Sequence, residues 1–287
     1  LLPQVITLLV TTLAKVGPAE ASPAAAEATI ACLRCLQQWL SLGMGCSLLM
    51  LVDSAPALLS TAVAALGSTN SSLSDGAADA FCELMATANT ALSPAVEKAL
   101  QCTHGLADQL GQAAVALRVP DALSAGEELD GRQFNLVRVT CAFAERAVDV
   151  IAQDASGRLL PLVQLVFTCL SGELRVAELS IDFWAGLQDT PLAMRHEQLR
   201  APLFREVAAR MMARCRLPAS FTTWADEDDL DEDEFERFRE QSAQPVFASC
   251  LQLLHADFVT TLAAQLDGDS PAWQSFELVC YVTRCVH

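Results

Sequence analysis

Apolar residues recur at three- and four-residue steps along most of the chain, the spacing that places side chains on one face of an α-helix. Polar segments at 17–23, 67–75, 120–131 and 268–271 separate the apolar stretches. The pattern predicts an all-α protein. The clearest stripes are Ile30, Leu33, Leu36 and Leu40; Phe134, Val137, Cys141, Ala144, Val148 and Ile151; Leu159, Leu162, Val166 and Leu170; and Val176, Leu179, Phe183 and Leu187.

The expected helices follow one another in pairs, with a period of roughly 40–47 residues that is typical of HEAT repeats. One pair cannot cover its own apolar stripe, so neighbouring pairs stack. We therefore expect a right-handed α-solenoid of HEAT-like antiparallel helix pairs, with a compact helix bundle as the alternative. The pairs are 2–16 with 24–41, 47–66 with 75–91, 95–118 with 131–153, 158–171 with 174–190, and 197–215 with 232–266, followed by a single helix at 273–286.

Composition supports this interpretation. The chain has 287 residues, of which 52% are hydrophobic, and only 13 Gly and 12 Pro, so it favours helices and can bury a large core. It starts and stops inside helix-like sequence. We expect residues 1–287 to form a single solenoid of about five and a half helix pairs, from a longer protein whose N- and C-terminal repeats are missing here. No apolar stretch is long enough to predict a membrane span.

The charge and the cysteines narrow the partners and the compartment. A net charge of −17 disfavours nucleic-acid binding, which depends on Lys and Arg, and suits basic partners better. The 11 cysteines lie singly on apolar faces at irregular spacing. That usage indicates reduced, buried thiols in a cytosolic or nuclear protein and not a disulfide scaffold.

Motifs for catalysis, cofactor binding or metal binding are absent from the sequence. Cys32 and Cys35 form a Cys-x-x-Cys, but they lie in a helix without a second ligand pair, so buried core cysteines are the expected outcome. The four histidines lack metal-ligand spacing, and we expect them to be solvated or to cap helices. We expect no enzyme activity, no cofactor and no catalytic or metal residues.

An acidic stretch is the most informative polar feature. Carboxylates in the first turn of a helix stabilise its dipole, which is one explanation of the cluster. The other is a surface that binds basic protein segments, because clustered charge steers encounter and discriminates by sign. Both remain open. The candidate contacts for basic cargo are Trp224, Asp226, Glu227, Asp228, Asp229, Asp231, Glu232, Asp233 and Glu234.

Three further features carry expectations. Trp39, Trp184 and Trp273 should pack in the core. Pro245 should kink a long helix, because it lacks an N–H donor. An arginine series does not line one helix face, so we expect the series to pair with the acidic stretch or to be solvated; its members are Arg195, Arg200, Arg205, Arg210, Arg214 and Arg216.

Several motifs resemble the importin-β (karyopherin) superfamily, and within it the importin-13/transportin-3 branch. Phe183-Trp184 with 187–189 resembles the family's Phe-Trp-x-x-Leu-x-(Asp/Glu) helix. Residues 221–239, with Phe235-x-x-Phe238-Arg239, resemble its acidic loop and the helix that follows. Pro271-x-Trp273 with Glu277 resembles the start of a later repeat, and 32–39 an earlier helix that ends in Trp.

The resemblance implies a nuclear transport receptor that shuttles between cytoplasm and nucleus. Such a receptor binds protein cargo, chiefly for import, contacts nucleoporin Phe-Gly repeats and is regulated by Ran-GTP. Cargo in this branch is basic or Arg/Ser-rich, and Ran-GTP is bound mainly by N-terminal repeats that this chain lacks. No direct binding of nucleic acid or membrane is implied. The alternative is a non-transport HEAT-repeat scaffold or regulatory subunit.

Overall fold

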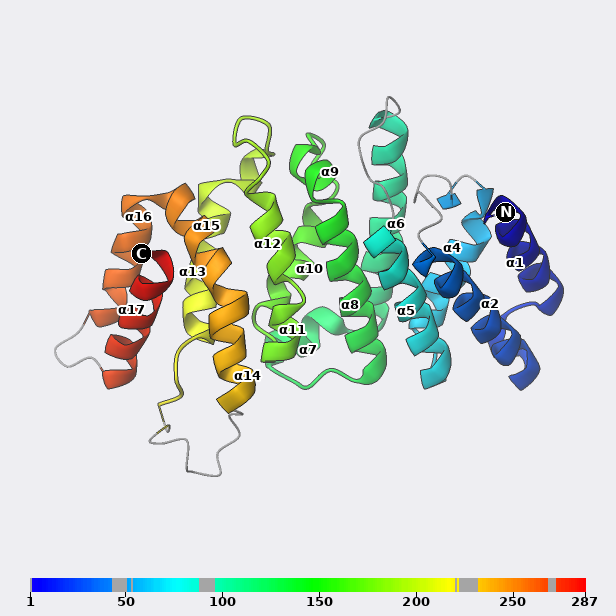
Figure 1. The fold of residues 1–287 in the computed structure, drawn as a ribbon, viewed down its shortest axis with the longest axis horizontal. Helices are drawn as coiled ribbons and strands as arrows, with labels where there is room; N and C mark the ends of the chain where they lie inside the picture. Colours follow the sequence, from blue (N-terminus) through cyan, green and yellow to red (C-terminus); the bar gives the residue numbers. More distant parts are fainter. Residues whose placement is uncertain are drawn as a thin grey trace. The chain divides into compact units, whose positions relative to one another are not determined.

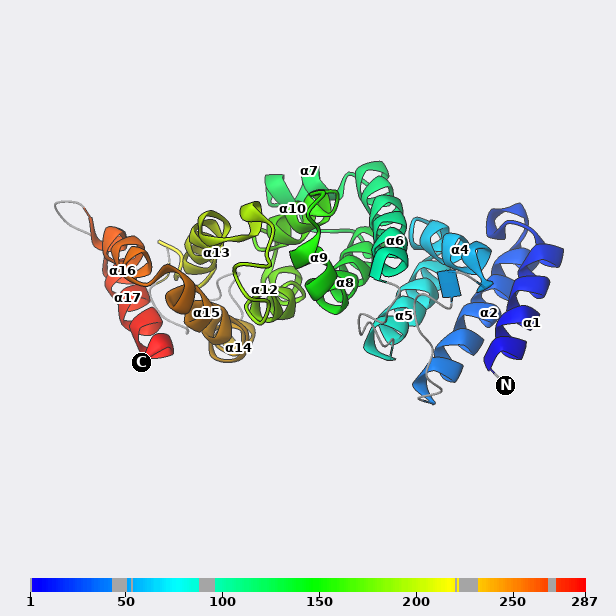
Figure 2. The same cartoon turned by 90° about the horizontal axis from the view of Figure 1, so that it is seen from above.

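The structure is a computed structural model that describes residues 2–42, 51–52, 54–87, 96–219, 221, 232–267 and 272–287. Within these ranges the chain forms helices, turns and loops and contains no strand. The chain divides into two compact units, Leu1–Val166 and Phe167–His287. Figures 1 and 2 show the helices of each unit from two directions.

Unit 1 consists of two layers of helices. In one layer α1, α4 and α6 are neighbours, and in the other α2, α5 and α8 are neighbours, as Figure 2 shows from above. Because consecutive pairs bury their apolar stripes against one another, this is the stacked arrangement of a HEAT array. The helices are α1 (Leu2–Val16), α2 (Pro23–Ser41), α4 (Pro56–Leu66), α5 (Ser71–Thr87), α6 (Val96–Ala116), α7 (Val119–Ala125), α8 (Gly131–Arg146) and α9 (Val148–Gln153).

Local sequence sets the helix ends in unit 1. Ser22 caps α2, with its hydroxyl accepting from the amide of Ala25 at 3.1 Å, and Pro23 occupies the first helical turn. Asp130 and Gln133 form a capping box at the start of α8. The Gln133 amide also donates to the carbonyl oxygen of Leu117 at 2.9 Å, which ties the start of α8 to the end of α6.

Polar contacts hold the layer of α5 and α8 in register. The Asn135 amide donates to the Ser74 hydroxyl at 3.1 Å and to the Asp75 carboxylate at 2.7 Å. One turn further along, Arg138 pairs with Asp79 at 3.1 Å. Asn135 is buried, so its hydrogen bonds offset the cost of removing its amide from water.

Unit 2 repeats the two-layer plan after α10 (Leu160–Cys169), which runs across the boundary between the units. Contacts join α12, α15 and α17 on one side and α13 with α16 on the other. The core of this unit is aromatic, and Phe183, Trp184, Phe204 and Phe247 are fully buried. The remaining helices are α11 (Leu174–Glu178), α12 (Ile181–Leu187), α13 (Ala201–Arg214), α14 (Glu232–Arg237), α15 (Gln244–Leu254), α16 (Ala256–Ala263) and α17 (Trp273–Val286).

The region predicted as one helix over 232–266 is interrupted twice. A π-helical segment, η3 (Phe238–Ala243), joins α14 to α15 directly before Pro245. A π turn adjusts the hydrogen-bond ladder where the proline N–H is missing, so the irregularity predicted at Pro245 is present in this form. The second interruption is His255, whose left-handed φ of 48° ends α15 and starts α16.

Other predicted helices need correction at positions without strong breaker residues. The helices predicted over 131–153 and 174–190 are each two helices, which break at Ala147 and at Leu179-Ser180. The segment 120–131, predicted as a connection, begins with α7. The prediction of a helix over 197–215 is wrong at its start, because Arg200 is extended before Pro202. Helices 2–16 and 273–286 are confirmed.

Candidate functional site

The predicted acidic stretch lies only partly within the described residues. Trp224, Asp226, Glu227, Asp228, Asp229 and Asp231 lie outside them. Glu232, Asp233 and Glu234 form the first turn of α14, where carboxylates are stabilised by the helix dipole. The dipole explanation therefore accounts for part of the cluster and leaves the binding role a prediction.

Both ends of the acidic segment are anchored in one apolar cluster. Phe221 precedes the segment and Phe235 follows it, and the two pack with Leu217 in a buried cluster that Leu174 covers. Burying an aromatic side chain stabilises the fold by ~1.5–3 kcal/mol, so the cluster fixes where the segment leaves and rejoins unit 2. The sequence analysis noted Phe221 and Phe235 in a motif but not as anchors.

Exposed carboxylates continue beyond the predicted stretch. Glu232, Asp233, Glu236 and Glu240 are all exposed, and Glu234 is half-buried. Among the described residues no ion pair is found for the four exposed carboxylates. The only described base on α14, Arg237, lies 3.6 Å from Glu178 on α11. This surface of α14 and η3 is therefore negative, and Glu240 is a member that the sequence analysis missed.

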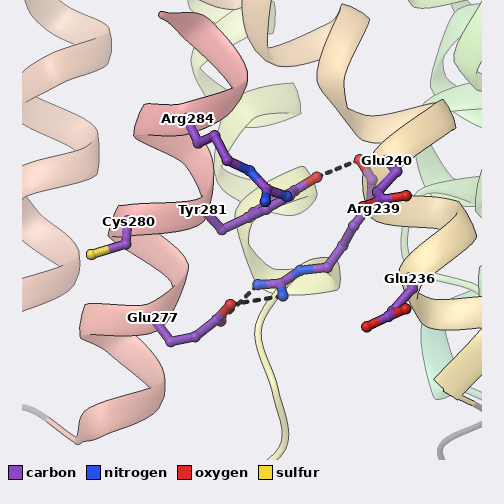
Figure 3. A pocket seen from close by; sticks show the side chains of 7 residues that line it. All are labelled: Glu236, Arg239, Glu240, Glu277, Cys280, Tyr281 and Arg284. Atoms are coloured by element: carbon purple, nitrogen blue, oxygen red, sulfur yellow. Dashed lines mark hydrogen bonds and ion pairs between the residues drawn. The ribbon is translucent and has the colours of Figure 1, made fainter.

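The acidic surface borders a pocket of about 380 Å³ between η3 and α17. Figure 3 shows the seven residues that line it: Glu236, Arg239, Glu240, Glu277, Cys280, Tyr281 and Arg284. Glutamates from both helices face arginines from both helices here. The pocket is thus a mixed-charge site in which the order of ion pairing decides what remains available to a partner.

Arg239 is fully engaged within the protein. Its two terminal nitrogens donate to the two carboxylate oxygens of Glu277 at 2.8 and 2.6 Å, the bidentate geometry visible in Figure 3. Its guanidinium carbon lies 4.0 Å from the ring centre of Tyr281 and 4.9 Å from that of Phe235. Glu277 and Arg239 cancel each other, so Glu236 and Glu240 carry the negative charge that is open to solvent.

The tyrosine of the pocket is held in its neutral form. Burial raises the pKa of Tyr281, and the nearby thiols of Cys215 and Cys285 raise it further. Its hydroxyl donates a hydrogen bond to the carbonyl oxygen of Arg239. Burial also raises the pKa of Cys215 to about 12. These groups act as uncharged structural contacts of α17 at neutral pH.

The arginine series has structural partners, which corrects the expectation of pairing with the acidic stretch or solvation. Arg195 is 3% exposed and donates to the carbonyl oxygens of Gln188 and Thr190, and burial lowers its pKa. Arg200 donates to the carbonyl oxygen of Arg195. The other described contacts are Arg205 with Asp257, Arg210 and Arg214 with Ser171, and Arg216 with Gln265.

The other singled-out residues divide between confirmed and corrected predictions. His196 caps the short helix η2 (Glu197–Leu199), as expected. His104 is neither solvated nor a cap, because it is buried with Nε2 3.4 Å from the Asp154 carboxylate. Cys32 is buried and Cys35 half-buried, both as free thiols. Within the described residues no group of three or more His, Cys, Asp or Glu side chains could hold a metal ion.

Of the three tryptophans predicted in the core, the structure confirms one. Trp184 is fully buried, with its ring edge-on to Phe183 at 4.9 Å and to Phe167 at 6.1 Å. Trp39 is half-buried. Trp273 is 50% exposed, because it starts α17 beside Phe221 at the surface. A helix stripe does not show whether its first residue reaches the core.

Comparison with solved structures decides the fold family. Importin 13 in its cytosolic state aligns over 99% of this chain with a TM-score of 0.70 and 15% identity. The chain has the HEAT-type solenoid fold of the importin-β family. A mutant of Kap121p, in which two aspartates and a glutamate are replaced by lysine, aligns over 99% with a TM-score of 0.58 and 12% identity.

The extent of these matches bounds what they show. The chain spans 35% of the importin 13 chain and 25% of the Kap121p chain. No protein-family model and no curated protein sequence matches it. No helix in the described ranges has both the length and the apolar character to cross a membrane. The fold of a nuclear transport receptor is therefore established, and its activity belongs to the proposal that follows.

Proposed function

We propose that this chain is a segment of a nuclear transport receptor of the importin-13/transportin-3 type. The segment binds protein cargo, chiefly for import, within a receptor that Ran-GTP regulates and that contacts nucleoporin Phe-Gly repeats as it shuttles between cytoplasm and nucleus. Residues 1–287 contribute one run of HEAT repeats to that receptor, and they bind without catalysing a reaction. The alignment with importin 13 along nearly the whole chain is the observation that carries the proposal.

The acidic surface identifies the class of cargo. Glu232, Asp233, Glu236 and Glu240 present unpaired carboxylates directly after the segment that holds Asp226, Glu227, Asp228, Asp229 and Asp231. Clustered carboxylates attract basic segments and reject acidic ones. A basic or Arg/Ser-rich protein segment is thus the cargo that fits, with Trp224 and Glu234 as further contacts.

The first experiment tests the receptor class. The full-length protein should be retained on a resin of Phe-Gly repeats, and bound cargo should leave when Ran-GTP is added, whereas Ran-GDP should have no effect. Both effects follow if the two ligands are coupled through one receptor. Failure of both would favour a HEAT-repeat scaffold without a transport role.

The second experiment tests the surface. A peptide of alternating arginine and serine is titrated into the wild-type chain and into a variant with Glu232→Gln, Asp233→Asn, Glu236→Gln and Glu240→Gln. At ~0.2–1 kcal/mol for each exposed pair, loss of four carboxylates should weaken binding about tenfold at low salt. The difference should shrink as salt rises, because screening removes long-range attraction.

A matched control removes the same charge elsewhere. Glu20→Gln, Glu27→Gln, Glu127→Gln and Asp267→Asn also neutralise four exposed carboxylates. This control should bind the peptide like the wild type. Equal weakening in both variants would mean that net charge alone attracts the peptide, and the assignment to α14 and η3 would be wrong.

A further inference from the structure

Two arginines of α13 converge on one serine of a neighbouring turn. The terminal nitrogen Nη1 of Arg210 donates to the Ser171 hydroxyl, and Nη2 of Arg214 donates to the Ser171 carbonyl oxygen at 2.9 Å. Ser171 lies in the connection between α10 and α11. Arg210 and Arg214 are four residues apart, so both side chains leave the same face of α13.

These arginines differ from most others in this acidic chain. Among the described residues neither Arg210 nor Arg214 has a carboxylate within ion-pair distance. Arg210 instead stacks on the ring of Phe167 at 4.4 Å, and burial lowers the pKa of Arg214. By contrast, carboxylates pair with Arg118, Arg132, Arg138, Arg158, Arg175, Arg205, Arg237 and Arg239.

We propose that Ser171 is a phosphorylation site whose phosphate is held by Arg210 and Arg214. A protein kinase would transfer the terminal phosphoryl group of ATP to Ser171. The Oγ–H bond breaks, an Oγ–P bond forms, and ADP and a proton leave. The product carries close to two negative charges and three acceptor oxygens, which guanidinium groups bind in bidentate fashion.

The position of Ser171 suits this role. The side chain is half-buried and lies outside the helices, so a kinase can reach it after local opening of the turn. Phe167 already orients the Arg210 guanidinium, and the contact with the carbonyl oxygen orients Arg214. The phosphate would therefore meet two donors that are fixed beside the serine before modification.

Two features oppose the phosphate and set the size of the effect. Ser171 follows the C-terminus of α10, where the helix dipole repels negative charge. Glu173 is two residues away, although Arg175 neutralises it with a contact of 2.7 Å. Two direct guanidinium contacts outweigh a dipole and one neutralised carboxylate, so the phosphate should bridge the α10–α11 turn to α13.

The test uses chains with phosphoserine inserted during translation at position 171, or at position 60 as a control. Ser60 is exposed on α4, and no arginine contact is described for it. Phosphorus NMR should show the second pKa of phosphoserine 171 lowered by about one unit from the usual value near 6, a tenfold shift toward the dianion. The shift should weaken at high salt and be absent at position 60.

The arginines are then changed in the phosphorylated chain. Arg210→Gln and Arg214→Gln, singly and together, should return the pKa toward its usual value, and either single variant suffices if the double variant does not fold. A phosphate that titrates normally in the unsubstituted chain would overturn the proposal. Equal thermal stabilisation of the unmodified chain by millimolar inorganic phosphate would also overturn it, because the site would then be a general anion site.

The modification itself is tested by mass spectrometry of the full-length protein from kinase-containing cells treated with phosphatase inhibitors. Phosphate on Ser171 is the expected result. Complete recovery of unmodified Ser171 peptides would contradict the proposal, whatever the NMR result. Neither readout depends on cargo or on Phe-Gly repeats, so failure here is distinguishable from failure of the proposed transport role.

Discussion

Tyr281 and Arg239 are joined through two contacts. The Tyr281 hydroxyl donates to the backbone carbonyl oxygen of Arg239, while the Tyr281 ring lies 4.0 Å from the guanidinium carbon of the same residue. One contact fixes the backbone of η3, and the other fixes the side chain that Glu277 binds. The pair therefore connects α17 to the π-helical segment beside the acidic surface.

Tyr281→Phe should lower the free energy of unfolding by about 1–2 kcal/mol. The ring stacking remains, but the buried carbonyl oxygen of Arg239 loses its described side-chain donor. Urea unfolding followed by circular dichroism measures the change. Thr283→Val removes an exposed hydroxyl from the same helix and should change stability by less than about 0.5 kcal/mol. Equal effects would mean that the Tyr281 hydrogen bond contributes nothing specific.

The same residue predicts a loss of stability at alkaline pH. Tyr281 is the single tyrosine of the chain, and its pKa is raised by burial. An unfolded phenol ionises near pH ~10, whereas the folded phenol stays neutral, so the folded state binds more protons and stability falls as pH rises above ~10. Phenolate absorbance should appear only with unfolding. Ionisation near pH 10 without unfolding would contradict the burial of this side chain.

Asp154 predicts the opposite slope at acid pH. Burial opposes its ionisation, but hydrogen bonds from Ser156 and Leu159, with the charge of His104, hold its pKa below the usual value. The unfolded state then binds more protons, so stability from this group is present above pH ~4 and is lost as pH falls through the folded pKa.

Asp154→Asn should therefore cost about 1–3 kcal/mol at pH 7 and flatten the decline below pH ~4. The free energy of unfolding is measured between pH 2 and 7, values of roughly the acid range in which carboxylates titrate. Asp267→Asn, at an exposed position, serves as the control and should leave the curve unchanged. An unaltered acid slope in Asp154→Asn would remove the role given to this carboxylate.

Two tryptophans provide a matched comparison of burial. Trp184→Ala should lower the free energy of unfolding by about 3–5 kcal/mol, because it opens a cavity beside Phe167 and Phe183. Trp273→Ala removes the same side chain from a half-exposed position and should cost less than about 1.5 kcal/mol. Similar losses would contradict the placement of one of the two rings.

The fold was predictable because helix periodicity is a local signal. The stripe through Leu33 and Leu36 and the stripe through Val176 and Phe183 lie in helices whose apolar faces are buried, as expected. Pro23 and Ser22 fixed the start of α2 in the same local way. Stacking then follows, because each pair needs a neighbour to cover its stripe.

The helix breaks were less predictable because tertiary packing overrides local preference. Ala147 and His255 have no intrinsic tendency to end a helix, and neither Pro nor Gly lies beside them. The partners of the candidate site were missed for a related reason. Arg239 meets Tyr281 across more than 40 residues of sequence, and helix periodicity carries no information about contacts between helices.

The π-helical segment has a consequence for insertions and deletions in this chain. A five-residue hydrogen-bond spacing takes up more chain in each turn than an α-helix does. Deleting one residue between 238 and 243 would permit a regular helix, but it would rotate all that follows by about 100°. Phe247 and Cys250, now fully buried, would turn away from the core. The length of this short segment therefore sets the angular phase between the carboxylates of α14 and the apolar side of α15.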